Sequence, residues 1–166
     1  MGQRPTQGHV CRSLAVNAGP EADLDLLLTK HGLHERPAPP KAISKTLEAK
    51  DRDDLTALPT LHLEPWSGND APILPAVSLE TLDNGLKLWI HAPAIAERVG
   101  LGSPLDLHLR EQGEALCVGS RWLPLIPAAL TQAAALQAGK PQPALSVALE
   151  LSSDGELAHY RFCRSV

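Results

Sequence analysis

Aromatic residues are scarce in this chain of 166 residues, which contains three Trp, one Tyr and one Phe. Its core must therefore be built from Leu, Ala, Val and Ile. Side chains on which nucleic-acid bases could stack are equally scarce, which counts against independent binding of single-stranded nucleic acid. A chain of this length is expected to form one domain with a single core and additional tails.

Cysteine is also rare, and its three positions, Cys11, Cys117 and Cys163, are widely spaced. An odd number without a Cys-x-x-Cys pair indicates neither a disulfide framework nor a cysteine zinc site. Because Cys117 and Cys163 fall in apolar segments, we interpret them as inert core thiols. No apolar run reaches the roughly 20 residues that span a bilayer, and the N-terminus lacks an apolar signal core. We expect a cytoplasmic protein without membrane contact.

The chain has no excess of positive charge, since its formal net charge is −4. It therefore exerts no overall attraction on a phosphate backbone. Residues 1–52 carry a small excess of basic side chains, whereas residues 53–166 are acidic.

The first third of the sequence reads as a tail followed by a helix and a linker. Residues 1–20 lack periodicity and are interpreted as a flexible tail. A short helix is predicted over residues 21–31, because Leu24, Leu27, Leu28 and His31 share one helical face and Gly32 can end it. The remainder of residues 21–53 is rich in Pro and charge, which is typical of an extended connector.

The pattern of residues 54–166 predicts an α+β fold with a mixed or antiparallel sheet. Alternating runs predict hairpins over residues 77–91 and 144–163, and Asp83-Asn84-Gly85 can supply positive φ angles at the first turn. Helices are predicted over residues 104–112 and 128–138, the first with Ser103 as N-cap, Pro104 at N1 and Gly113 at its end. We also expect a helical turn within residues 94–99 and one or two strands within residues 117–126.

Short motifs in a fixed order resemble the catalytic domain of the ribonuclease II/ribonuclease R family, the RNB domain. They are Asp54-Leu55-Thr56-x-Leu58-Pro59, Val77-Ser78-Leu79-Glu80, Leu82-Asp83-Asn84-Gly85, His91, Gly102-Ser103-Pro104-Leu105-Asp106, Gly113, Leu125-Ile126-Pro127-x-x-Leu130, Ala144-Leu145-Ser146-Val147, Asp154-Gly155, Tyr160-Arg161 and Arg164-Ser165. The resemblance covers the opening half of that domain, so residues 54–166 are interpreted as a partial RNB-like domain.

The resemblance implies a protein related to enzymes that hydrolyse single-stranded RNA from its 3′ end with Mg²⁺ held by four aspartates. Several carboxylates are needed because Mg²⁺ prefers oxygen ligands and must polarise a phosphodiester while activating water. Glu64 and Asp70 have the spacing of the first two acids, and they are the candidate catalytic and metal-binding residues. RNA is the partner that the resemblance implies.

The remaining acids of that pattern are missing. The third and fourth positions fall on Pro72 and Ile73 when counted from Glu64, or on Leu74 and Pro75 when counted back from Val77. The Asp that ends the family's His-Ile-Ala-Asp segment is replaced by Ala94, and an expected aromatic by Cys117. The chain also stops before the half of the domain that carries RNA-clamping aromatics and an assisting arginine. We expect weak Mg²⁺ binding at best and no catalysis by this chain.

Several residues have alternative interpretations. The pair His62-x-Glu64 resembles the zinc deaminase motif, but the downstream Pro-Cys-x-x-Cys is absent. We interpret His91 as a hydrogen-bonded structural residue and Trp89 as part of a core or sheet face. Trp66 and Trp122 are candidates for base stacking.

Two other functions remain open: a non-catalytic RNA-binding or regulatory module, and an interaction protein that pairs with a partner or with itself through an exposed sheet edge. A functional remnant and the product of an interrupted gene would have the same sequence.

Overall fold

A computed structural model of the chain describes residues 19–33, 39–40, 51–63, 71–119 and 121–166. The chain divides into two units, residues 1–38 and residues 39–166, and each is described by itself. The first unit contains helix α1, Pro20–Lys30, which begins with Pro at its first turn and is followed by Gly32 at φ 66°. This agrees with the predicted helix to within one residue at each end.

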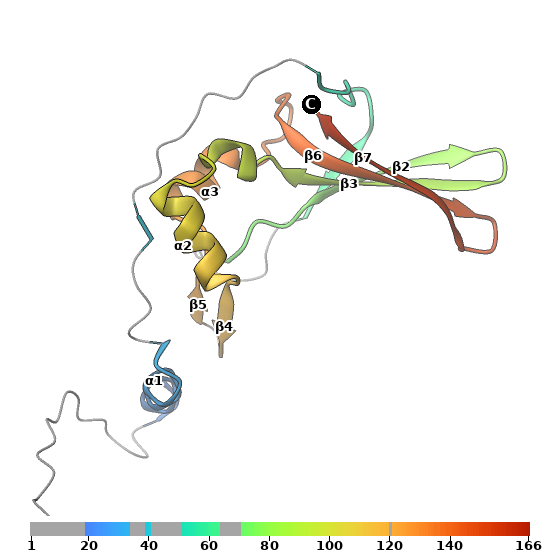
Figure 1. The fold of residues 1–166 in the computed structure, drawn as a ribbon. Helices are drawn as coiled ribbons and strands as arrows, with labels where there is room; N and C mark the ends of the chain where they lie inside the picture. Colours follow the sequence, from blue (N-terminus) through green and yellow to red (C-terminus); the bar gives the residue numbers. More distant parts are fainter. Residues whose placement is uncertain (1–18, 34–38, 41–50, 64–70, 120) are drawn as a thin grey trace, which may run out of the picture. The chain divides into compact units, whose positions relative to one another are not determined.

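The second unit contains a five-stranded antiparallel sheet in the order β1-β2-β3-β6-β7 (Figure 1). Its strands are β1 Thr60–His62, β2 Ala76–Leu82, β3 Gly85–Pro93, β6 Ala144–Ser152 and β7 Leu157–Ser165. The two long hairpins, β2-β3 and β6-β7, are those that the alternating sequence predicted, and with the short helices they confirm the α+β fold. Strand β1 has only three residues and was not predicted.

The first hairpin turns through Asp83 and Asn84, because Leu82 pairs with Gly85. Within the predicted turn Asp83-Asn84-Gly85, the positive φ is supplied by Gly85, at 149°. A Cβ atom at Gly85 would also collide with the carbonyl oxygen of Leu151 on β6. Glycine is therefore required both by the backbone angle and by the close approach of a third strand.

The helical segments of the second unit are short. A 3-10 turn, η2, covers Ala96–Arg98, within the predicted residues 94–99. Helix α2, Pro104–Gln112, has the predicted ends: the Ser103 hydroxyl accepts from the backbone N–H of Asp106, and Gly113 follows at φ 73°. The predicted strands near Cys117 form a two-stranded sheet of β4, Leu116–Val118, and β5, Arg121–Leu123.

Helix α3 covers Ala128–Ala134, four residues shorter than the predicted 128–138. The side chain of Gln142 explains the early end. Its amide nitrogen donates to the carbonyl oxygen of Ala135 at 2.9 Å, and its amide oxygen accepts from the backbone N–H of Gln137. These backbone groups are satisfied by one side chain, so they do not need a further helical turn.

Residues 53–55 run parallel to the end of β7 on its outer side. The backbone N–H of Asp53 donates to the carbonyl of Arg164, that of Leu55 to Val166, and that of Val166 back to Asp53, at 2.8–3.0 Å. The last residues of β7 are thus paired on both sides. No helix within the described residues is long and apolar enough to cross a membrane.

Candidate functional site at the His91 end of the sheet

Five polar side chains, one from each strand, form a continuous hydrogen-bonded row across the sheet. Thr60 Oγ1 lies 2.8 Å from Ser78 Oγ, which lies 2.9 Å from His91 Nε2. On the other side of the ring, His91 Nδ1 lies 2.7 Å from Ser146 Oγ, which lies 2.6 Å from Ser165 Oγ. Ser78, His91, Ser146 and Ser165 are all buried. We call these five residues the polar row.

The direction of the hydrogen bonds in the polar row follows from the contact of Thr60 with the backbone. Thr60 donates its hydroxyl proton to the carbonyl of Leu58 at 3.0 Å, so it must accept from Ser78. Because each hydroxyl has one proton, Ser78 then accepts from His91 Nε2–H. A neutral ring leaves Nδ1 to accept from Ser146, and Ser146 then accepts from Ser165 at 2.6 Å, a much shorter contact than the 3.4 Å between Ser165 Oγ and the Ala144 carbonyl. Every buried polar atom of the row is satisfied when His91 is neutral.

Burial also favours the neutral ring, because desolvation lowers the pKa of His91 below its usual range. The ring is stacked on Trp89, with centroids 6.1 Å apart and planes 7° from parallel. The guanidinium of Arg161 lies over the Trp89 ring, 5.7 Å from its centroid. Both ring nitrogens have partners, which confirms that His91 is a hydrogen-bonded structural residue.

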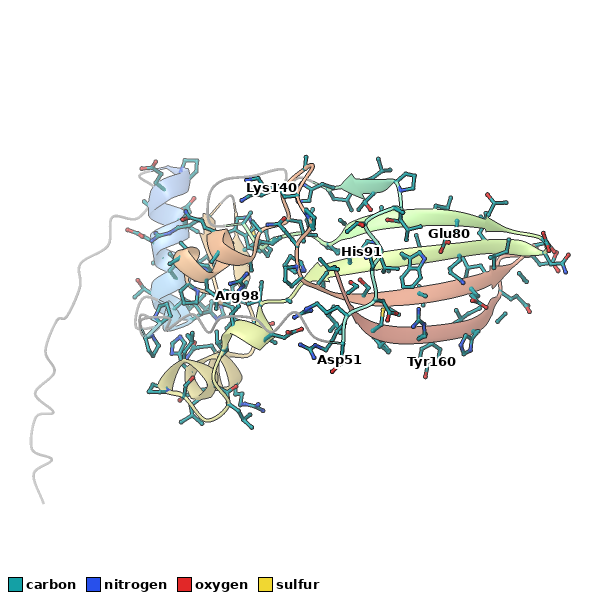
Figure 2. All side chains as sticks on the ribbon, turned by 90° about the horizontal axis from the view of Figure 1, so that it is seen from above. Asp51, Glu80, His91, Arg98, Lys140 and Tyr160 are labelled. Atoms are coloured by element: carbon teal, nitrogen blue, oxygen red, sulfur yellow. The ribbon has the colours of Figure 1, made fainter. Side chains whose placement is uncertain are left out.

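A cavity of about 580 Å³ opens beside the polar row. Thr60, His91 and Ser165 contribute to one wall. The segment that follows α3 contributes another, including Lys140, which Figure 2 places near the same end of the sheet as His91. The rest of the described lining is mostly apolar or amide-bearing, with Thr56 and His62 as further polar members, and none of its side chains is acidic. The cavity is therefore suited to neutral or anionic groups rather than to a bare cation.

The predicted acids Glu64 and Asp70 lie outside the described residues, as does Trp66. Their segment nevertheless starts and returns at the His91 end of the sheet. It leaves β1 after His62 and rejoins β2 at Ala76, and these two residues are paired. His62 and Ala76, the described residues on either side of this segment, both line the cavity beside the polar row.

The positions that the resemblance assigns to the third and fourth acids have apolar surroundings. Pro72 and Ile73 line a second cavity of about 210 Å³ together with Ala71, Ile95, Ala115, Pro124, Leu125, Ile126, Ala128, Thr131 and Gln132. Leu74 and Pro75, the alternative positions, are half-buried. Ala94, which replaces another expected acid, is also buried. Pro72 itself is exposed, whereas a carboxylate at the partly or fully buried positions would lose hydration.

A charged cluster joins residues 52–53, η2 and β7 at this end of the sheet. The Glu97 carboxylate contacts Arg52 Nη2 at 2.5 Å and Arg164 Nη2 at 3.2 Å. Burial raises the pKa of Glu97, but hydrogen bonds and positive charge from the two arginines outweigh this and hold the pKa below its usual range. Arg161 forms a separate pair with Asp53 at 2.7 Å. These basic groups are therefore engaged by carboxylates.

The two described cysteines are free thiols. Cys117 is exposed, so its interpretation as a core thiol was wrong: it lies on β4, which forms a separate two-stranded sheet with β5, and its side chain remains in contact with solvent. Cys163 is partly buried, and desolvation followed by the nearby Asp53 raises the pKa of its thiol. Trp89 is buried, as predicted.

Sequence reasoning missed the serines of the polar row. Ser78 and Ser146 occupy positions in their strands that face the same side as His91, and a small hydroxyl at an inward position of an apolar strand was the available signal. Among the described residues, no group of three or more His, Cys, Asp or Glu side chains is arranged to hold a metal ion.

Comparisons with known proteins agree with the motif order. The model of the RNB domain matches residues 52–166. Exoribonuclease 2 of Sodalis glossinidius is 33% identical over 137 residues, which cover 79% of this chain and 20% of that protein. Ribonuclease R of Acidithiobacillus ferrooxidans is 25% identical, with coverage of 99% of this chain and 39% of the relative. The chain thus spans between a fifth and two fifths of these relatives.

The solved structures show the same fold. RNase R of Mycoplasma genitalium in complex with ribose-methylated single-stranded RNA superposes with a TM-score of 0.67 at 15% identity, covering 92% of this chain and 25% of that one. Its complex with double-stranded RNA gives 0.68. Because the RNB model matches more than half of the sequence, and fold and motif order agree with it, the chain belongs to the RNB-domain family of exoribonucleases.

Proposed function

We propose that this chain is a non-hydrolytic member of the RNB family, related to Mg²⁺-dependent 3′→5′ exoribonucleases but without their cleavage of RNA. The observation that carries the proposal is the apolar setting of Pro72 and Ile73. When the family motif is counted from Glu64, these residues fall at its third and fourth acids, and they line a cavity whose side chains are mostly apolar, with Thr131 and Gln132 as polar members.

Mg²⁺ chemistry does not fit the residues present. The ion binds oxygen ligands in near-octahedral geometry, and two carboxylates can hold it only weakly, with several waters retained. Glu64 and Asp70 are the only acids of the motif that the sequence retains. Charge stabilisation and positioning supply most of the barrier reduction in phosphodiester cleavage, so the loss of half the ligands removes the basis for catalysis.

His91 does not offer a replacement catalyst. A general base must reach its substrate with a free lone pair, whereas both nitrogens of His91 are engaged by Ser78 and Ser146. At its Thr60 end the row donates to the backbone carbonyl of Leu58 rather than to a carboxylate. The arrangement supports a structural role in which the polar row fixes the register of the strands.

RNA is the partner class that family membership suggests, and we propose that this chain binds it weakly. Several of the described cations are paired with carboxylates: Arg52 and Arg164 with Glu97, Arg161 with Asp53, and Lys87 with Glu150. The formal net charge of −4 adds no overall attraction for a phosphate backbone. Anisotropy titrations with labelled single-stranded RNA should give dissociation constants above roughly 10 μM at physiological salt. Salt-dependent binding in the low micromolar range would contradict this.

The test of inactivity is a cleavage assay with uniformly labelled single-stranded RNA and millimolar Mg²⁺. We expect no release of mononucleotides under conditions in which an active RNB exoribonuclease digests the same substrate completely. The variants Glu64→Ala and Asp70→Ala separate true activity from a contaminant. If the chain releases mononucleotides and either variant abolishes that release, the proposal is wrong.

A further inference from the structure

One face of the five-stranded sheet is aliphatic and exposed. Alternation along the strands places a continuous set of apolar side chains on the side opposite the polar row. We call this the aliphatic face; it consists of Val77, Leu79, Leu86, Leu88, Ile90, Leu145, Val147, Leu149, Leu151, Leu157, Tyr160 and Phe162. Leu79 is 56% exposed, Leu145 50% and Phe162 66%.

The aliphatic face is too large to be an incidental feature of a surface. Four strands spaced about 4.8 Å apart and about 25 Å long present roughly 500 Å² in projection, and more when side-chain contours are followed. Contiguous apolar patches of this size usually mark interaction sites. Side-chain relief adds to this projected area, and a specific protein interface buries roughly 800 Å² of accessible surface per partner.

The charge distribution permits two copies to meet on this face. Arg164 is the charged residue that alternation places beside the aliphatic face, and it is held at its rim by Glu97 at 3.2 Å. Two copies would therefore bury aliphatic groups without stripping water from unpaired charges and without like-charge repulsion, although each chain is acidic overall. A polyanion such as RNA has nothing to contact here.

The distribution of side-chain size is also self-complementary. Bulky rings are concentrated on β7, where Tyr160 and Phe162 pack edge to face with centroids 6.0 Å apart. On the opposite side, β2 contributes the smaller Val77 and Leu79. A two-fold axis parallel to the strands and midway between β3 and β6 would set β7 of each copy over β2 of the other, so that large groups meet small ones.

We propose that the chain forms a symmetric dimer in solution by packing the aliphatic faces of two copies together as a sheet sandwich. This inference is independent of whether the chain cleaves RNA. It also differs from pairing through the edge of β7, because it uses side chains on the two interior strands, β3 and β6, rather than outward backbone groups.

The experiment is analytical ultracentrifugation of the full chain over a wide concentration range, with reductant present because Cys117 is exposed. The wild type should show a monomer–dimer equilibrium. Leu86→Glu and Leu145→Glu place a carboxylate on β3 and β6 at positions already 40% and 50% exposed, so the monomer should remain folded by circular dichroism. Each should raise the dissociation constant at least roughly 100-fold, because two buried carboxylates meet across the axis.

Leu101→Glu is the matched control, since Leu101 is 86% exposed and lies outside the sheet. It should leave the dimer unchanged. A wild type that stays monomeric at all concentrations would overturn the proposal. So would a dimer that survives both Leu86→Glu and Leu145→Glu, because edge pairing through β7 would tolerate these changes.

Discussion

The two faces of the sheet are built from alternate residues of the same strands, yet water reaches them very differently. On β6, Ser146 is 0% exposed while its neighbour Leu145 is 50% exposed, and on β2 the values are 3% for Ser78 and 56% for Leu79. The polar face is covered and the aliphatic face is open. Figure 2 shows His91 on one of the central strands and Tyr160 on the outer strand β7.

This contrast reverses the usual distribution in a sheet with one solvated face. The polar face can be buried because its hydrogen bonds are completed within the protein, from Thr60 through His91 to Ser165. The apolar side chains of the aliphatic face remain in contact with water, which is unfavourable. Burial of the first stabilises the monomer, and burial of the second requires another surface.

The largest loss of stability is expected for Ser146→Val on the covered face. The change removes the hydroxyl that joins His91 Nδ1 and Ser165 Oγ and adds a methyl group at a fully buried position. We expect the free energy of unfolding to fall by about 3 kcal/mol, because two buried polar atoms lose a partner and the site is overpacked. Urea unfolding monitored by circular dichroism measures it.

The control for this variant is Leu145→Ala on the same strand. Its side chain is half-exposed, so the cost to the monomer should stay below about 1 kcal/mol at concentrations where no dimer forms. If Leu145→Ala destabilises the monomer as much as Ser146→Val, the aliphatic face is covered within one chain.

The second variant, Glu97→Ala, alters the charged cluster at the rim of the two faces. The Arg52 side chain is 3% exposed, and the change removes the carboxylate that contacts both it and Arg164. We expect a loss of about 2 kcal/mol in unfolding free energy, less than for a fully buried pair because Glu97 is partly exposed. Arg110→Ala, which breaks the exposed pair with Asp106, should cost less than about 0.5 kcal/mol. Equal losses would contradict a structural role for Glu97.

The smallest effect is the pH dependence of stability that His91 contributes. Its folded-state pKa lies below the ordinary 6.5, so the unfolded chain takes up the proton first as the pH falls. The stability that depends on the neutral ring is fully present above pH 6.5 and is lost as the pH falls through the folded-state pKa. Denaturation midpoints should decline from about pH 7.5 to about pH 5.5 in the wild type but not in His91→Asn. An unchanged slope in the variant would show that other groups cause the decline.

Much of the fold could be predicted because the relevant signals are local. Alternation predicted both long hairpins, and Ser103, Pro104 and Gly113 predicted the ends of α2. Errors arose where a distant residue intervened. The side chain of Gln142 ends α3 early, and pairing with β2 makes a strand of β1, whose three residues carry too little pattern to be recognised alone.

The candidate site was predicted less completely. Motif order led to family membership and to Glu64 and Asp70, which lie outside the described residues and remain predictions. The hydrogen-bonded role of His91 was predicted, but its partners could not be, because Ser78 and Ser165 approach it only through the order of strands in the sheet. The core role of Cys117 was wrong because an apolar segment need not face a core.

The sequence by itself determined the two long hairpins, the ends of α2 and the family, since these depend on the identity of residues and on short-range spacing. Only the tertiary structure decided which side of the sheet is covered, which hydroxyls meet His91 and where the aliphatic side chains gather. The physical reason is that side-chain alternation divides each strand into two sets, but only the pairing of strands and the elements around them decide which set loses its contact with water.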